Sequence, residues 1–236
     1  MYNEIFKRKI DDIVKKENPY GILLVGSASK QEKIDFENIT DLDIFVILKN
    51  GEFEREVVNI EDIDYDVSYI SIESLEFCIK NKISSVINVL ANGKVIYKSG
   101  DTIDNILYQI KELYKAKPDK PLDYEKDYIR FKLTQQYFTV LNRKDDEINF
   151  EFLANIFIKD MIISYLKLNQ RWILPDKKLL KEIKDDTLEN IIKSYYKTNN
   201  INNKIQSLKM ALEYIIEPFG GKLNYWKKGI YPFDFI

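Results

Sequence analysis

The spacing of hydrophobic positions in the first hundred residues switches between a helical period and a strand period. Residues 3–17 repeat apolar side chains at close to a helical period, and Pro19 ends that pattern. Residues 72–90 fit a helix as well. Short apolar or alternating runs between turn signals such as Asn50-Gly51 predict strands. The expected strands are residues 21–25, 41–48, 65–72 and the stretch GKVIYKSG.

Beyond residue 100 the pattern becomes helical throughout. Prolines and asparagine-rich turns separate the apolar segments. The expected helices are residues 102–116, 123–142, 148–169, 176–184, 187–198 and 201–217. Strands separated by helices predict an α/β or α+β domain over residues 1–100, followed by a helical bundle over residues 101–236.

The composition restricts the chemistry. The 236 residues include no histidine, which excludes a Ser-His-Asp triad and a His-ligated zinc ion. Cys78 is the one cysteine, so neither an intramolecular disulfide nor a thiolate metal cluster can form. Any reaction would therefore depend on carboxylates, lysines, hydroxyls and a hard metal ion.

Charge and hydropathy bear on partners and location. Residues 1–100 carry 13 basic and 18 acidic side chains, and the remainder carries 23 and 20. No segment is basic enough to predict a nucleic-acid partner. No apolar stretch reaches the roughly 20 residues that span a bilayer, and the charged start does not resemble a secretory signal. We expect a cytoplasmic protein without a membrane partner.

Two aspartates stand at the start of the apolar stretch TDLDIFVIL. Asp41 and Asp43 are two residues apart on the predicted strand, so their side chains point to the same face, about 6.6 Å apart along the chain. Carboxylates placed together on an apolar sheet repel each other unless a cation lies between them, and magnesium prefers such oxygen ligands. A solvated acidic pair at the edge of a strand is the alternative.

Two further sequence features could belong to the same site as Asp41 and Asp43. Gly26 and Ser27 end the strand LLVGS, where a glycine lets the backbone approach a phosphate and the hydroxyl and N–H groups can bind it. Asp66 lies on the later strand YDVSYI and could be a third metal ligand if that strand neighbours the first. Asp64 faces the same way and competes with it. We favour Asp66 because its flanking residues are more typical of a strand.

The combined pattern resembles the signature of the DNA polymerase beta-like nucleotidyltransferase superfamily. The pattern is an apolar strand ending in Gly-Ser, thirteen residues, Asp-x-Asp on an apolar strand, and a strand with aspartate between hydrophobic residues. The resemblance covers about residues 1–100. It implies an α+β fold in which a mixed-sheet nucleotidyltransferase head precedes an all-helical domain, similar to antibiotic (aminoglycoside- or lincosamide-type) nucleotidyltransferases.

The resemblance also implies roles for the residues that match. Asp41, Asp43 and Asp66 would ligate two Mg²⁺ ions, and Asp66 would help to deprotonate the acceptor. Gly26 and Ser27 would hold the triphosphate of ATP or another nucleoside triphosphate. Many members of the superfamily carry Arg-Gly shortly after Gly-Ser, whereas this loop reads ASKQEK. Lys30 or Lys33 could supply the missing charge, or could be solvated loop lysines.

The expected reaction is magnesium-dependent transfer of a nucleoside monophosphate, AMP from ATP, to a hydroxyl group of a small molecule such as an antibiotic. The helical domain would bind this acceptor, and Glu151 or Asp160 on its apolar helix could act as an additional base or could be exposed polar positions. The alternatives are a nucleotidyltransferase that modifies a protein or tRNA, as in toxin–antitoxin pairs, and a non-catalytic nucleotide-binding module.

Overall fold

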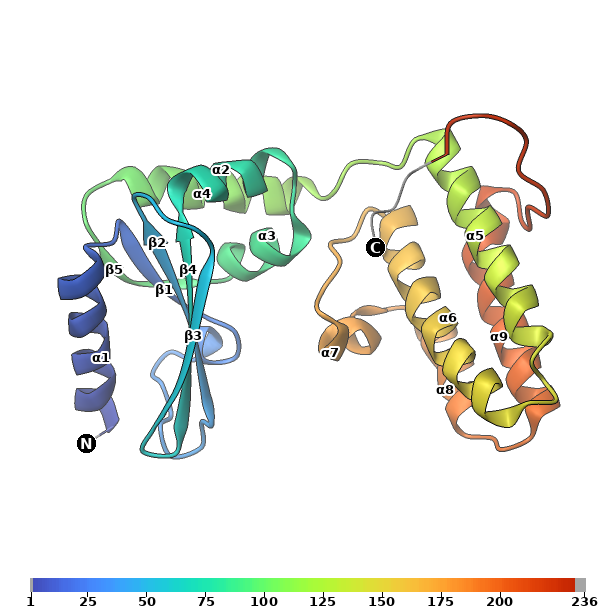
Figure 1. Cartoon of the computed structure of the whole chain (residues 1–236), viewed down its shortest axis with the longest axis horizontal. Coiled ribbons are helices and arrows are strands. Elements are labelled where there is room, and N and C mark those ends of the chain that lie inside the picture. The colour runs from blue at the N-terminus through green and yellow to red at the C-terminus, as the bar shows by residue number, and fades with distance from the viewer. Residues whose placement is uncertain (1, 232–236) are drawn as a thin grey trace. The chain divides into compact units, whose positions relative to one another are not determined.

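The computed structural model describes residues 2–231 of the protein. The predicted strands and helices occur in it in the predicted order along the chain (Figure 1). The chain consists of two compact units, Met1–Lys117 and Pro118–Ile236. The first unit contains α1 (Tyr2–Glu17), β1 (Gly21–Val25), η1 (Ala28–Lys30), β2 (Asp41–Leu48), β3 (Glu54–Ile60), β4 (Ile63–Ser71), α2 (Ile72–Lys80), α3 (Ser84–Ala91), β5 (Lys94–Lys98) and α4 (Thr102–Ala116). The second contains α5 (Asp123–Leu141), α6 (Glu147–Leu168), α7 (Asp176–Leu179), η2 (Leu180–Glu182), α8 (Asp186–Tyr196), α9 (Ile201–Ile216) and η3 (Glu217–Phe219).

The five strands form one mixed sheet in the order β3-β4-β2-β1-β5. β2 and β4 run parallel, and the other neighbouring pairs run antiparallel. The central strands β1 and β2 are almost wholly buried, as their apolar runs predict. A mixed sheet in one unit and helices alone in the other confirm the predicted α+β class.

Helices cover both faces of the sheet. Phe6, Ile10 and Ile13 of α1 join one face in a core cluster that includes Leu42 and Ile44 of β2. α4 lies against the opposite face, where a Cβ atom on Gly21 would be 2.9 Å from the Ile103 side chain. The residues Leu23, Val25, Phe45, Ile47 and Ile70 are buried on that face. Asp41 and Asp43 share the face of Phe45, because side chains alternate along a strand.

The strand β3 is an element that the sequence pattern did not predict. It pairs with β4 through a two-residue turn in which Glu61 and Asp62 both have positive φ, 51° and 62°. Hairpin turns of this kind favour Asn-Gly, which is the signal that sequence reasoning looks for. The acidic pair Glu61-Asp62 gives no such signal, so the local sequence does not predict the hairpin.

The predicted helix over residues 72–90 is two helices, α2 and α3. The first ends in a reversal where Lys82 has φ of 50° and the Ile83 N–H donates to the Cys78 carbonyl at 2.9 Å. This hydrogen-bond pattern commonly ends helices at a glycine, whereas here lysine has the left-handed conformation.

The boundary between the two units falls after Lys117, because α4 belongs to the first unit. This is later than the boundary after residue 100 that is expected from the sequence.

The second unit is built from helices whose positions follow the predicted segments closely. The side chains of Asp146, Asp185 and Asn200 accept backbone N–H groups at the starts of α6, α8 and α9. One buried cluster, which includes Leu133, Phe157 and Leu212, joins α5, α6 and α9. Within the described residues, no helix is both long and apolar enough to cross a membrane.

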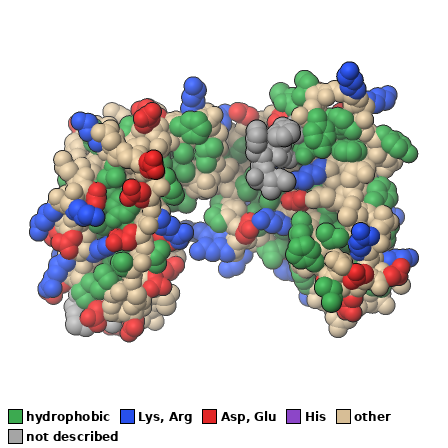
Figure 2. All heavy atoms as spheres, viewed as in Figure 1, with side chains coloured by type: hydrophobic (Ala, Val, Ile, Leu, Met, Phe, Trp, Pro, Cys, Tyr) green, Lys and Arg blue, Asp and Glu red, His purple; other side chains and the backbone are tan. Residues whose placement is uncertain are grey.

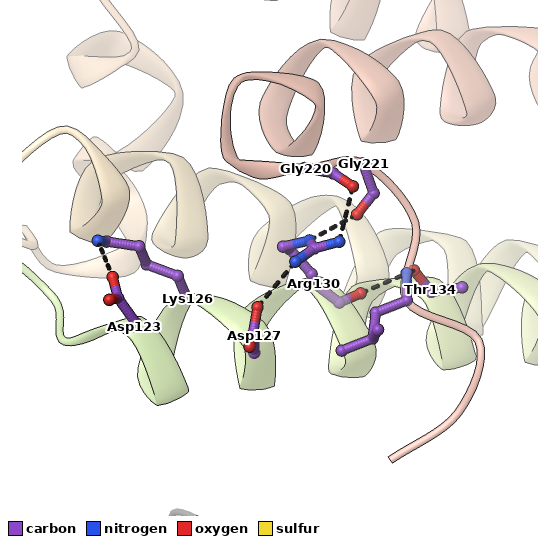
Figure 3. Close-up of polar contacts among 8 residues, drawn as sticks. Asp123, Lys126, Asp127, Arg130, Thr134, Gly220 and Gly221 are labelled. Atoms are coloured by element: carbon purple, nitrogen blue, oxygen red, sulfur yellow. Dashed lines mark hydrogen bonds and ion pairs between the residues drawn. The ribbon is translucent and has the colours of Figure 1, made fainter. Parts of the chain in front are cut away.

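Arg130 on α5 holds the segment that follows α9 (Figure 3). Its guanidinium donates to the carbonyl groups of Gly221 at 2.7 Å and Gly220 at 2.6 Å, and to Asp127 at 2.7 Å. Both glycines have positive φ, and a Cβ atom on Gly220 would lie 3.1 Å from the guanidinium. The Gly-Gly pair therefore lets the chain turn directly against α5. In the same close-up, Lys126 pairs with Asp123 at 2.7 Å.

Candidate active site

The parallel pairing of β2 and β4 brings four aspartates together. Asp41 is opposite Asp64, and Asp43 is opposite Asp66. Paired residues on neighbouring strands point to the same face, and strands are spaced about 4.8 Å apart. The sequence-based hypothesis that the Asp66 strand neighbours the Asp41–Asp43 strand is therefore correct in its geometry.

The end of β1 adjoins this group from the other side. Val25 is the last β1 residue paired with β2, and its partner is Asp43. Gly26 follows with φ of 69°, and a Cβ atom built on it would be only 2.0 Å from Asp43 Oδ2. Ser27 is exposed beside it, and the Ser29 hydroxyl donates to the Gly26 carbonyl at 2.9 Å. Gly26 thus lies next to Asp43, and Ser27 is the following residue.

An arginine that the sequence analysis did not single out is bound to one of the aspartates. Arg55 on β3 donates Nε–H to Asp66 Oδ1 at 2.7 Å and Nη2–H to Asp66 Oδ2. The hydrogen bond to Asp66, together with the negative charges of Asp66 and then Asp43, raises the pKa of the Arg55 guanidinium. Arg55 is therefore a positively charged side chain bound beside the four aspartates.

Asp66 and Asp64, the two candidates for the third metal ligand, differ in exposure and in position along β4. Asp64 is exposed and accepts from Asn59 Nδ2 at 2.7 Å, whereas the Asp66 side chain is 22% exposed. Asp66 is at the level of Asp43, where β1 still pairs with β2, whereas Asp64 is level with Asp41, beyond the last residue of β1. Asp66 is accordingly the aspartate of β4 that is level with Asp43, the residue that Gly26 approaches.

The lysines expected to replace the missing arginine lie on the loop after β1. Lys30 is the last residue of η1, which is a single short turn, and Lys33 follows it. Both side chains are exposed. Among the described residues, neither lysine side chain has a hydrogen bond or ion pair that would fix it at a phosphate site.

The aspartates fit a magnesium site in residue type and in strand register. Oxygen ligands on one face of two adjacent strands match the preference of Mg²⁺. Among residues 2–231, however, no three carboxylate or thiol side chains are grouped closely enough to hold a metal ion. The Asp66 carboxylate is occupied by Arg55 instead, which accounts for part of this mismatch.

The two carboxylates suggested as an additional base lie in the second unit, and each has polar partners there. Glu151 accepts from the Tyr195 hydroxyl at 2.8 Å and from Lys204 at 2.5 Å. Asp160 accepts from Gln136 and lies 3.5 Å from Lys132 Nζ. These contacts link α6 to its neighbouring helices, so both residues have a structural role within this unit.

Arg55 could have been found from the sequence only through β3. It is the one basic residue in the stretch EREVVNI, which begins with three charged residues in a row. Recognising a hairpin at Glu61-Asp62 would have placed Arg55 next to the Asp66 strand. Without that turn, nothing in the local pattern relates the two residues.

Comparisons with known proteins add a limited observation. No model of a protein family matches this chain. No curated protein matches it either. Among solved structures, the chain is similar to a nucleotidyltransferase-like protein from Exiguobacterium sibiricum, with 11% identity and a TM-score of 0.44, over 92% of this chain and 75% of that one. Similarity at this level carries no weight for function, which has to be argued from the site. Fold and site together define an α+β protein with an acidic group at one end of its central strands.

Proposed function

We propose that the protein is a nucleotidyltransferase that moves a nucleoside monophosphate, AMP from ATP, onto a hydroxyl group of a small molecule such as an antibiotic. One observation carries the proposal. Asp43 is in register with Asp66 across two parallel strands, Asp41 is on the same face, and Gly26-Ser27 ends the strand on the other side of Asp43. This arrangement matches the order of features in the sequence signature.

The site residues have distinct roles in this reaction. Gly26 permits the triphosphate to approach the backbone, and the Ser27 hydroxyl can donate to a phosphate oxygen. Asp41, Asp43 and Asp66 are the residues that would hold magnesium, which when bound supplies positive charge against the phosphates. Asp66 also accepts the proton of the acceptor hydroxyl.

The bond changes balance without a redox partner. The acceptor oxygen forms a bond to the α-phosphorus, and the bond from that phosphorus to the bridging oxygen of the β-phosphate breaks. Pyrophosphate leaves with the electron pair of that bond, and the proton of the hydroxyl passes to a carboxylate. Because a carboxylate accepts this proton, the reaction requires no histidine, which is consistent with a chain that has none.

The experiment combines binding and turnover. Purified protein is incubated with magnesium and α-labelled nucleotides against a panel of hydroxyl-bearing small molecules, and products are identified by mass spectrometry. Asp43→Asn should abolish any product, whereas Asp11→Asn, which removes an exposed carboxylate from α1, should leave it unchanged.

A melting experiment tests the same site without knowledge of the acceptor. ATP with magnesium should raise the melting temperature of the wild type by mass action, and ATP with a chelator should raise it much less. Equal shifts in both conditions, with no transfer to any acceptor, would indicate a nucleotide-binding protein without this activity. The absence of any shift would contradict nucleotide binding altogether.

A further inference from the structure

The starting point is the two-pronged contact between Arg55 and Asp66. Both oxygens of the Asp66 carboxylate accept from the guanidinium, Oδ1 at 2.7 Å. A bidentate contact of this kind fixes the plane of the carboxylate as well as its position, because two parallel hydrogen bonds leave one favourable orientation. Asp66 therefore faces β3 in this structure.

The contact places the positive charge of Arg55 beside the aspartates of β2 and β4. Carboxylates on adjacent strands repel each other unless a cation lies among them. Arg55 acts electrostatically on Asp43 as well as on Asp66. The next residue along β3, Glu56, points to the other face of the sheet, where Lys9 of α1 pairs with it at 2.8 Å. Arg55 is thus the basic residue that β3 contributes to the aspartate face.

The arginine side of this contact is open to solvent, and the aspartate side is partly buried. The Arg55 side chain is 61% exposed and the Asp66 side chain 22%. Because water reaches the guanidinium, solvent screens its attraction to the Asp66 carboxylate. A divalent cation held by several carboxylates can therefore compete with the guanidinium for Asp66.

We propose that Arg55 is a positioning residue that holds the Asp66 carboxylate in the metal-free protein, and that a divalent cation binds only by displacing the guanidinium from Asp66. This inference rests on the proposed function, in which Asp66 is a metal ligand. It also agrees with aspartates that have the register of a metal site although, among residues 2–231, no three carboxylate or thiol side chains are grouped closely enough to hold a metal ion.

The test measures the affinity of the protein for Mn²⁺. If Arg55 had only a structural role, its removal would leave this affinity unchanged or lower it. Mn²⁺ binding to the full chain is titrated by calorimetry and by electron paramagnetic resonance, for the wild type and Arg55→Gln. Because the competing cation is gone, Arg55→Gln should bind Mn²⁺ roughly tenfold more tightly, equivalent to about 1.4 kcal/mol. In chelator, the same variant should melt at a lower temperature than the wild type, since its carboxylates have lost their counter-ion. Mn²⁺ should then raise its melting temperature more than that of the wild type.

Two controls separate competition at Asp66 from a general change in charge. Arg8→Gln removes the same charge from an exposed position on α1, on the other face of the sheet, and should keep the wild-type Mn²⁺ affinity. Arg55→Gln is also made in an Asp66→Asn background, where the gain in affinity should disappear, because coupled residues give non-additive effects. A gain that persists without the Asp66 carboxylate would overturn the inference.

The outcomes distinguish this inference from the proposed function. If Arg55→Gln binds Mn²⁺ no more tightly than the wild type, while the wild type transfers nucleotide with magnesium, Arg55 does not compete and only this inference is wrong. If neither protein binds Mn²⁺ and ATP with magnesium causes no melting shift, the proposed function is wrong, and this inference is wrong with it.

Discussion

The Asp43 carboxylate lies directly against the backbone of Gly26, so that a Cβ atom on Gly26 would be 2.0 Å from Asp43 Oδ2. Side-chain atoms do not approach this closely, and Gly26 also has a left-handed φ of 69°. The contact joins the end of β1 to the aspartates of β2, and glycine is the residue that permits it.

Gly26→Ala should therefore affect both stability and activity. The left-handed conformation costs an alanine about 1–2 kcal/mol, and the new methyl group must displace Asp43. We expect a lower melting temperature and a loss of nucleotide transfer of roughly 100-fold or more. Gly100→Ala is the matched control, because Gly100 has φ of 86° but no atom within 4 Å of its Cβ position. If both variants transfer nucleotide equally well, contact with Asp43 is unimportant for the site.

Neutralising either central aspartate should separate stability from activity. Asp41→Asn and Asp43→Asn each remove a charge from a group of like charges, so the melting temperature in chelator should hold or rise. Transfer should be abolished, because each variant loses an oxygen ligand that magnesium prefers. The checks are a melting curve and a product assay. Turnover near the wild-type rate with magnesium in either variant would refute the metal site.

The two aspartates of β4 should differ in their effect on turnover. Asp66→Ala should cost roughly 100-fold or more, the order seen when a central electrostatic group is removed. Asp64→Ala should cost less than about 10-fold, because a step of two residues moves a side chain about 6.6 Å along the strand. Asp64 is also exposed and bound to Asn59. Steady-state kinetics on both variants decide the matter, and the reverse order would make Asp64 the ligand.

The turn between β3 and β4 offers a stabilising substitution away from the aspartates. Glu61 and Asp62 both have positive φ, which glycine and asparagine adopt more readily than other residues. Replacing the pair by Asn-Gly should stabilise the protein by about 1 kcal/mol and raise the melting temperature by about 2–4 °C. Differential scanning calorimetry measures the change. A lower melting temperature would mean that the acidic pair has contacts worth more than the strain.

The sequence by itself determined most of the elements of this protein. Runs of apolar residues bounded by prolines and capping residues located the predicted helices of the second unit, because these signals are local to each segment. It also placed Asp41 and Asp43 on one face of a strand, since that relation depends only on the alternation of side chains along β2. The α+β class followed from the order of these elements along the chain.

The tertiary structure alone decided which residues of different strands are neighbours. The parallel pairing of β2 with β4 puts Asp66 beside Asp43, and the unpredicted β3 brings Arg55 to Asp66. The close approach of Gly26 to Asp43 likewise depends on the register between β1 and β2. Strand pairing is set by which apolar faces pack together across long stretches of chain, and the local sequence around Arg55 or Gly26 contains no record of that choice.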